Sequence, residues 1–137
     1  MPKPALAPAP RSNLVLIGAR GCGKSTVGSI LAGLLGRELI DTDSEIERET
    51  GMSVRDIFER CGEDEFRLIE SRVLARALAG ERRIVSVGGG AVLREENRVL
   101  MASRARCVWL TAEPEELLRR LLADGRSATL RPPLTAL

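Results

Sequence analysis

Apolar positions along this chain fall into two patterns, short continuous runs and longer segments with apolar residues three or four positions apart. The short runs predict strands buried on both faces, whereas the longer segments predict helices that bury one side. The predicted strands are 13–17, 37–40, 83–87 and 106–110. The predicted helices are 26–35, 44–49, 53–60, 63–79, 94–101 and 114–122. Strands alternating with helices indicate an α/β domain with a parallel sheet and right-handed crossovers.

Two of the predicted helices have clear apolar sides that we expect to be buried. In the first helix these positions are Val27, Ile30, Leu31, Leu34 and Leu35. In the longest helix they are Phe66, Ile69, Val73, Leu74, Ala77 and Leu78.

The segment between the first strand and the first helix carries the strongest chemical signal. Gly18–Ser25 reads Gly-Ala-Arg-Gly-Cys-Gly-Lys-Ser, the pattern of a phosphate-binding loop. Glycines let backbone N–H groups wrap phosphates, and the following helix N-terminus adds partial positive charge. We expect Lys24 to reach the terminal phosphates and the Ser25 hydroxyl to ligate Mg²⁺. A chance glycine-rich turn is disfavoured, because strand, motif and helix agree.

Composition narrows the class of protein. The 137 residues suit one domain, and the formal net charge of +2 comes with no basic block and no tyrosine, so nucleic-acid binding is unsupported. No apolar run approaches the ~18 residues of a membrane span. The N-terminus lacks the apolar stretch of a signal peptide, and its prolines predict a disordered tail over 1–12. Three scattered cysteines match no disulfide framework, which favours a cytoplasmic location. The absence of histidine excludes histidine-based catalysis.

Three further polar features suggest ligand contacts, and each also has an interpretation that involves no ligand. Asp41 and Asp43 come after the second strand. Alternation through Thr42 would point the two carboxylates in different directions, one toward a metal and one toward a substrate hydroxyl. The alternative is a solvated turn followed by a helix cap at Ser44. Gly88-Gly89-Gly90 suggests close backbone approach to a ligand, or a flexible loop. Arg67 and Glu70 lie three apart on one helix face. They could form a surface ion pair, or hold an arginine for a substrate carboxylate.

Taken together, these residues resemble the shikimate kinase family. The resemblance runs from about Asn13 to Pro133 and rests on an ordered set of motifs. The set comprises the phosphate loop, Asp41-Thr42-Asp43, Phe66-Arg67-Leu68-Ile69-Glu70, Gly88-Gly89-Gly90 and Arg131-Pro132. It implies a three-layer parallel-sheet fold of the nucleoside-monophosphate-kinase type within 13–137, with substrate-binding helices at about 44–79 and a lid at about 124–137. It also implies ATP and Mg²⁺ as cofactors, with shikimate 3-phosphate and ADP as the products, in aromatic amino acid biosynthesis.

The same resemblance implies roles for individual residues. Nucleotide phosphates would contact Gly21, Cys22, Gly23, Lys24, Ser25 and Thr26, and the metal would involve Ser25 and Asp41. Asp43 would be the base toward the 3-hydroxyl of shikimate, and Arg67, oriented by Glu70, would grip its carboxylate. Gly88, Gly89 and Gly90 would approach the ring, and Arg131 would close over the transferring phosphate. The partner would be this small molecule alone, bound by a monomer when the chain is complete.

Two departures from the family pattern keep alternatives open. The lid usually reads Arg-Pro-Leu-Leu but here reads Arg131-Pro132-Pro133-Leu134. The family continues beyond this point with a strand and a helix, which we expect to be absent, leaving the adenine site and a second carboxylate-binding arginine unassigned. A gluconate-type kinase and a noncatalytic ligand-sensing module therefore remain as alternatives. A GTPase is disfavoured because the Asn-Lys-x-Asp motif is missing.

Overall fold

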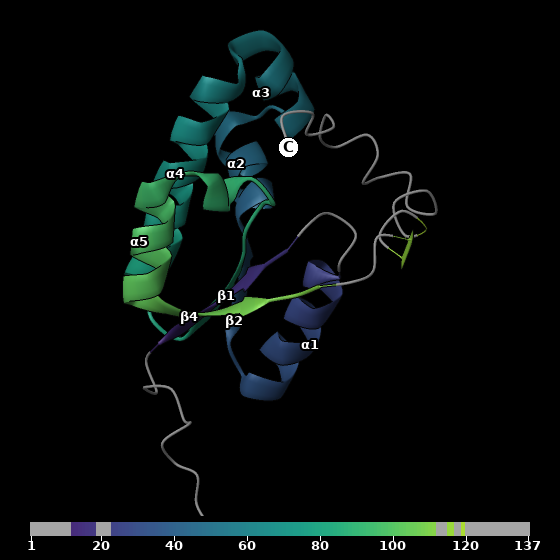
Figure 1. Cartoon of the computed structure of the whole chain (residues 1–137), viewed down its shortest axis with the longest axis vertical. Coiled ribbons are helices and arrows are strands. Elements are labelled where there is room, and N and C mark those ends of the chain that lie inside the picture. The colour runs from purple at the N-terminus through teal and green to yellow at the C-terminus, as the bar shows by residue number, and fades with distance from the viewer. Residues whose placement is uncertain (1–11, 19–22, 112–114, 117–118, 120–137) are drawn as a thin grey trace, which may run out of the picture.

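The protein forms an α/β fold in which β1, β2 and β3 are each followed by helical segments (Figure 1). The structure is a computed structural model that describes residues 12–18, 23–111, 115, 116 and 119. Its strands are β1 (Asn13–Ile17), β2 (Glu38–Asp41), β3 (Arg83–Ser86) and β4 (Ala105–Trp109). Its helices are α1 (Lys24–Leu35), α2 (Thr42–Thr50), α3 (Val54–Cys61), α4 (Glu63–Ala79), the 3₁₀ turn η2 (Ala91–Leu93) and α5 (Glu95–Arg104). Each predicted strand lies within one residue of an observed one.

The four strands form one parallel sheet in the order β2-β3-β1-β4, as the alternating pattern predicts. Leu16 of β1 and Asp41 of β2 both lie opposite Ser86 of β3, and Ile17 lies opposite Trp109 of β4. Parallel pairing in this register brings the carboxyl ends of the strands to the same edge of the sheet.

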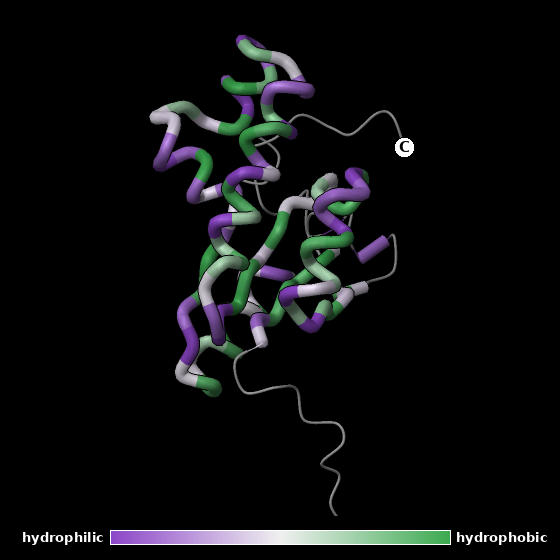
Figure 2. Tube along the Cα trace, turned by 90° about the vertical axis from the view of Figure 1, so that its left-hand side faces the viewer, coloured by the Kyte–Doolittle hydropathy of each residue, from purple (hydrophilic) through white to green (hydrophobic). Residues whose placement is uncertain are grey.

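Helices cover both faces of the sheet, which gives the expected three layers. In Figure 1, α1 lies on one side of the strands, and α4 and α5 lie on the other. The main hydrophobic cluster lies between the sheet and the α4–α5 layer. Its buried members are Val15, Leu74, Ala77, Leu78, Val85, Val87, Ala91 and Met101. Figure 2 shows the central strands as mostly hydrophobic, whereas the helices alternate between hydrophobic and hydrophilic positions.

Helix α4 belongs to two hydrophobic clusters. Its C-terminal half packs in the main cluster, and its N-terminal half packs with α2 and α3 in a second one. The second cluster contains Ile46, Val54, Ile57, Phe66, Ile69 and Val73. All six apolar residues predicted to be buried on this helix are buried. The helical part formed by α2, α3 and the start of α4 is thereby joined to the sheet through one continuous helix.

Helix α2 begins earlier than the sequence pattern predicts. Its first residue is Thr42, and its N-cap is Asp41, whose Oδ1 accepts a hydrogen bond from the backbone N–H of Ser44 at 3.1 Å. The predicted start at Ser44 is therefore two residues late, and the alternative of a solvated turn with a cap at Ser44 is wrong. Because Thr42 is helical, Asp41 and Asp43 are not related by strand alternation. A carboxylate directly after the strand satisfies a free N–H of the first helical turn, so the helix starts without an intervening turn.

The apolar side of α1 is only partly buried. Gly28 is its buried residue, and a Cβ at this position would lie 3.0 Å from Leu39 Cδ1. By contrast, the exposed fractions of Ile30 and Leu34 are 57% and 76%. The expected burial of this apolar side is thus not seen at Ile30 and Leu34, whereas Gly28 lies close to Leu39 and Leu16 of the sheet. Among the described residues, no helix is long and apolar enough to cross a membrane.

Asn13 connects the ends of the elements at the edge opposite the strand carboxyl ends. This side chain is 2% exposed. Its Nδ2 donates to the carbonyls of Leu78, Gly80 and Arg104, at 3.3, 3.0 and 3.4 Å. Its Oδ1 accepts from the backbone N–H of Arg83 at 2.9 Å. One buried amide therefore links the start of β1 to α4, β3 and α5.

Replacing Asn13 by alanine is expected to lower the free energy of unfolding by at least ~2 kcal/mol. The substitution leaves the Arg83 N–H and several carbonyls without their partner, and each unmet buried group costs about 1–3 kcal/mol. Urea denaturation measures the change, with exposed Ser103→Ala as a control expected to stay within about 0.5 kcal/mol. A loss no larger than that of the control would contradict the linking role of Asn13.

Candidate active site at the carboxyl edge of the sheet

The polar features singled out in the sequence come together where three neighbouring strands end. Gly18 follows β1, Asp41 is the last residue of β2, and Gly88 lies two residues after β3. Since these strands are parallel and adjacent in the sheet, their following residues share one edge. Ligands of open α/β sheets bind in the crevice outside this edge.

The described residues on either side of 19–22, at the end of β1 and the start of α1, have the features of an anion site. Gly23 caps α1 in a left-handed conformation with φ 99°, which glycine adopts without strain. The Lys24 Nζ donates to the Gly18 carbonyl at 2.6 Å, so the ammonium folds back over the start of the loop. Ser25 and Thr26 lie exposed in the first turn of the twelve-residue helix. Ammonium, hydroxyls and the positive end of the helix dipole therefore face the same region.

Asp41 serves as a helix cap and also remains chemically suited to a divalent cation. Capping uses its Oδ1, while a carboxylate has about four acceptor positions on two oxygens. Within the described part of the chain, no three or more Asp, Glu, His or Cys side chains cluster as a complete metal cage. Mg²⁺ fits this donor set, because it binds through one or two protein groups and takes its other ligands from phosphates and water.

Asp43 is placed by the packing of its neighbour Thr42. The buried Thr42 hydroxyl donates to the Ser86 carbonyl at 3.3 Å, which fixes the start of α2 against the end of β3. Asp43 follows in the first turn of α2 and is half-buried, with its Oδ1 shielded from solvent. A partly desolvated carboxylate is thus held between the ends of β2 and β3.

The Arg67–Glu70 pair is buried. Arg67 Nη1 donates to Glu70 Oε1 at 2.8 Å, and the two side chains are 8% and 1% exposed. The guanidinium carbon also lies 5.3 Å from the ring centroid of Phe66 and 5.9 Å from that of Phe58. The alternative of an ordinary surface ion pair is therefore wrong, and the arginine is held rigidly by a carboxylate and two aromatic rings.

The triple glycine lies against this arginine. Gly88 and Gly90 are buried, and a Cβ at Gly90 would lie 2.3 Å from Arg67 Nη2. That distance is far below any real contact, so only glycine leaves space for the guanidinium. The Arg67 side chain thus approaches this loop closely at Gly90, whereas the predicted approach of a ligand stays a prediction.

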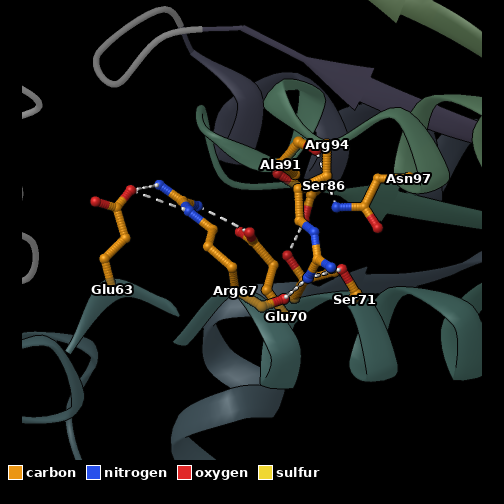
Figure 3. A network of polar contacts seen from close by, with 9 residues as sticks. Glu63, Arg67, Glu70, Ser71, Ser86, Ala91, Arg94 and Asn97 are labelled. Carbon is orange, nitrogen blue, oxygen red and sulfur yellow. Dashed lines mark hydrogen bonds and ion pairs between the residues drawn. The ribbon is translucent and has the colours of Figure 1, made fainter. Parts of the chain in front are cut away.

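Two residues that the sequence did not single out hold the glycine loop in place (Figure 3). Arg94 Nη1 donates to the Arg67 carbonyl at 3.1 Å and to Ser71 Oγ at 3.2 Å. The buried Asn97 Nδ2 donates to the Ala91 carbonyl at 3.0 Å. These bonds tie the segment after Gly90 to the backbone of α4 and to the start of α5. The Arg94 contacts join residues more than twenty positions apart, and the six-residue spacing of Asn97 and Ala91 is not a helical one, so no sequence pattern marks either residue.

A third unpredicted residue, Glu63, contacts Arg67 directly. Its Oε2 accepts from Arg67 Nε at 3.3 Å and from Nη2 at 3.2 Å. The spacing of four residues on one helix could have indicated this pair.

Three of the predicted site residues lie outside the described residues. These are Gly21, Cys22 and Arg131, the last within the predicted lid. The described remainder of the set gathers at one edge of the sheet.

Comparison with known proteins gives a consistent family. The family model described as shikimate kinase matches residues 20–136. A shikimate kinase of Symbiobacterium thermophilum is 46% identical over 123 residues, which cover 90% of this chain and 70% of that protein. For a shikimate kinase of Nitrobacter winogradskyi the identity is 48% over 109 residues, covering 80% of this chain and 51% of the relative. The chain thus spans between about half and 70% of the length of these two relatives.

Solved structures agree in fold. Shikimate kinase from Acinetobacter baumannii in complex with shikimate superposes with a TM-score of 0.82 at 39% identity, over 88% of this chain and 66% of that one. A gluconokinase from Sinorhizobium meliloti 1021 reaches a TM-score of 0.57 at 21% identity, over 91% of this chain and 70% of that one, a likeness of fold alone. A family model that matches most of the chain, relatives at nearly half identity and a solved shikimate kinase with the same fold lead to one conclusion: the chain belongs to the shikimate kinase family.

Proposed function

We propose that this protein transfers the terminal phosphoryl group of ATP to the 3-hydroxyl of shikimate, giving shikimate 3-phosphate and ADP in aromatic amino acid biosynthesis. The observation that carries the proposal is the buried arginine at the sheet edge, fixed by Glu70 and packed on Gly90. Such an arginine suits bidentate recognition of a carboxylate, which shikimate carries. The Acinetobacter relative is described in complex with shikimate, which supports the same substrate here.

The nucleotide phosphates are assigned to the turn between β1 and α1. Backbone N–H groups from Gly21 to Thr26, including those of Cys22 and Gly23, would surround the phosphates. Lys24 would leave the Gly18 carbonyl and neutralise charge on the terminal phosphates. Lys24 donates to a neutral carbonyl, so exchanging this contact for a phosphate oxygen gains a charged partner.

Ser25 and Asp41 are the residues assigned to Mg²⁺. When bound, the ion neutralises developing charge on the phosphates and orients them for transfer. Ser25 would donate a hydroxyl oxygen from the first turn of α1, and Asp41 would hold a metal-bound water from the end of β2.

Asp43 is assigned as the general base. Its half-buried carboxylate would accept the proton from the 3-hydroxyl oxygen as that oxygen bonds to phosphorus. Arg67 would bind the substrate carboxylate, and Gly88, Gly89 and Gly90 would let the ring approach the backbone. Arg131 would complete the charge neutralisation from the proposed lid at about 124–137. The substrate-binding region at about 44–79 corresponds to the helices of the second hydrophobic cluster, within one kinase domain over 13–137. We further propose that the protein is cytoplasmic, that it is a monomer when the chain is complete, and that it binds neither membrane nor nucleic acid.

Lys24→Ala is expected to abolish shikimate-dependent ADP release. The substitution removes the ammonium from the phosphate site, while the fold persists because Lys24 lies in a helix first turn outside both hydrophobic clusters. A coupled ADP-release assay with and without shikimate measures activity, and circular dichroism checks the fold. Unchanged turnover in a folded variant would overturn the phosphate-site assignment, and no shikimate-dependent turnover in the unmutated protein would count against the proposed activity.

Asp43→Asn is expected to lower kcat by roughly 10²-fold or more, the scale of a positioned base. Asparagine preserves the shape of the side chain but cannot take the substrate proton. Asp56→Asn, at an exposed position in the first turn of α3, makes the same chemical change away from the site. Equal rates for both variants would show that Asp43 is not the base.

Gly90→Ala is expected to weaken shikimate binding by about tenfold or more, because the new methyl group displaces the Arg67 guanidinium. A charged hydrogen bond is worth about 1.5–3 kcal/mol, and 1.4 kcal/mol corresponds to tenfold. Gly33→Ala is the matched control, since a Cβ there meets nothing within 4 Å. Calorimetric titration gives the dissociation constants. An unchanged shikimate constant, together with an unchanged constant for Arg67→Ala, would remove the carboxylate role from Arg67.

A further inference from the structure

Arg67 is bound by two carboxylates on opposite sides of its guanidinium group (Figure 3). Glu70 Oε1 accepts a hydrogen bond from Arg67 Nη1 at 2.8 Å. Glu63 binds the opposite edge, where its Oε2 accepts from Arg67 Nε at 3.3 Å and from Nη2 at 3.2 Å. The Nε–Nη2 edge is one of the two sides on which an arginine can bind a carboxylate through two parallel hydrogen bonds.

The two carboxylates differ in burial. The Glu70 side chain is 1% exposed, whereas that of Glu63 is 54% exposed. Glu70 is buried and cannot leave Arg67 without unpacking the residues around it. Glu63 is the first residue of α4, and its side chain can rotate into solvent.

We infer that Glu63 is an exchangeable internal ligand of Arg67 that occupies the position of the substrate carboxylate in the free protein. This inference rests on the proposed role of Arg67 in binding shikimate. The arriving carboxylate replaces Glu63 on the Nε–Nη2 edge, while Glu70 stays on Nη1. Glu63 thereby keeps a buried guanidinium paired before the substrate binds, and it lowers the affinity for the substrate by the strength of its own contact.

The exchange is easy because the contact that is lost is weak. An ion pair between residues four apart on a helix, with one side chain largely in solvent, contributes little to stability. Removing the competing carboxylate should therefore tighten shikimate binding about two- to fivefold. A residue that instead positions Arg67 would give the opposite sign, because its loss would leave the arginine disordered and weaken binding.

The test is a calorimetric titration of shikimate into the full chain and three variants. Glu63→Gln keeps the size of the side chain and removes its charge. Glu63→Asp keeps the charge and shortens the reach toward Arg67. Glu65→Gln is the matched control, since Glu65 is also an exposed acidic residue in the first turn of α4. Glu65→Gln removes the same charge from the same helix turn as Glu63→Gln, so it reproduces the effects on net charge and on the helix dipole.

We expect Glu63→Gln and Glu63→Asp to bind shikimate about two- to fivefold more tightly than Glu65→Gln, with equal affinity for ADP in all three. Unchanged or weaker shikimate binding in both Glu63 variants would overturn the inference. A titration of Arg67→Ala distinguishes failure of the Glu63 inference from failure of the proposed carboxylate contact of Arg67. If Arg67→Ala weakens binding and the Glu63 variants do not tighten it, the inference alone fails. If Arg67→Ala has no effect, the proposed carboxylate contact fails and this inference fails with it.

Discussion

The buried ion pair between Arg67 and Glu70 is the interaction on which the substrate side of this molecule depends. Removing a guanidinium from water is costly unless its charge is paired and its N–H donors are hydrogen-bonded. Here one buried carboxylate, one exposed carboxylate and two aromatic rings meet that requirement. The guanidinium also requires glycine at position 90, because any side chain there would occupy its place. A single buried charge thus fixes the residue types on three different elements.

Helix α4 transmits this constraint to the rest of the fold. Its C-terminal half packs on the sheet in the main hydrophobic cluster, and its N-terminal half carries Arg67 in the second cluster. Because the helix is continuous, the proposed carboxylate site keeps a fixed position relative to β3. The register of the parallel strands places Asp41 and the end of β1 at the same edge. Phosphoryl transfer gains most of its rate from positioning and charge neutralisation, which a rigid edge of this kind can supply.

Much of the fold follows from local pattern. The four strands and the buried side of α4 could be predicted because apolar runs and helical spacing record burial directly. The start of α2 and the burial of α1 could not be predicted in the same way. A helix start depends on which side chain reaches a free N–H, and Asp41 does so. The buried residue of α1 is Gly28, which lies close to Leu16 of β1 and Leu39 of β2, and the spacing of the larger apolar residues does not indicate this.

The sequence by itself determined the order of the elements, the phosphate-binding loop and most of the candidate residues, because these depend on residue types at short spacings. Tertiary structure alone decided that Arg67 and Glu70 are buried, although their spacing equally suits a surface pair. It also decided that Arg94 and Asn97 hold the glycine loop, and that Asn13 joins the ends of four elements. Each of these contacts joins residues far apart in the chain or depends on exclusion of water. Burial and long-range contact arise only when the sheet and its helices pack together, so no local pattern encodes them.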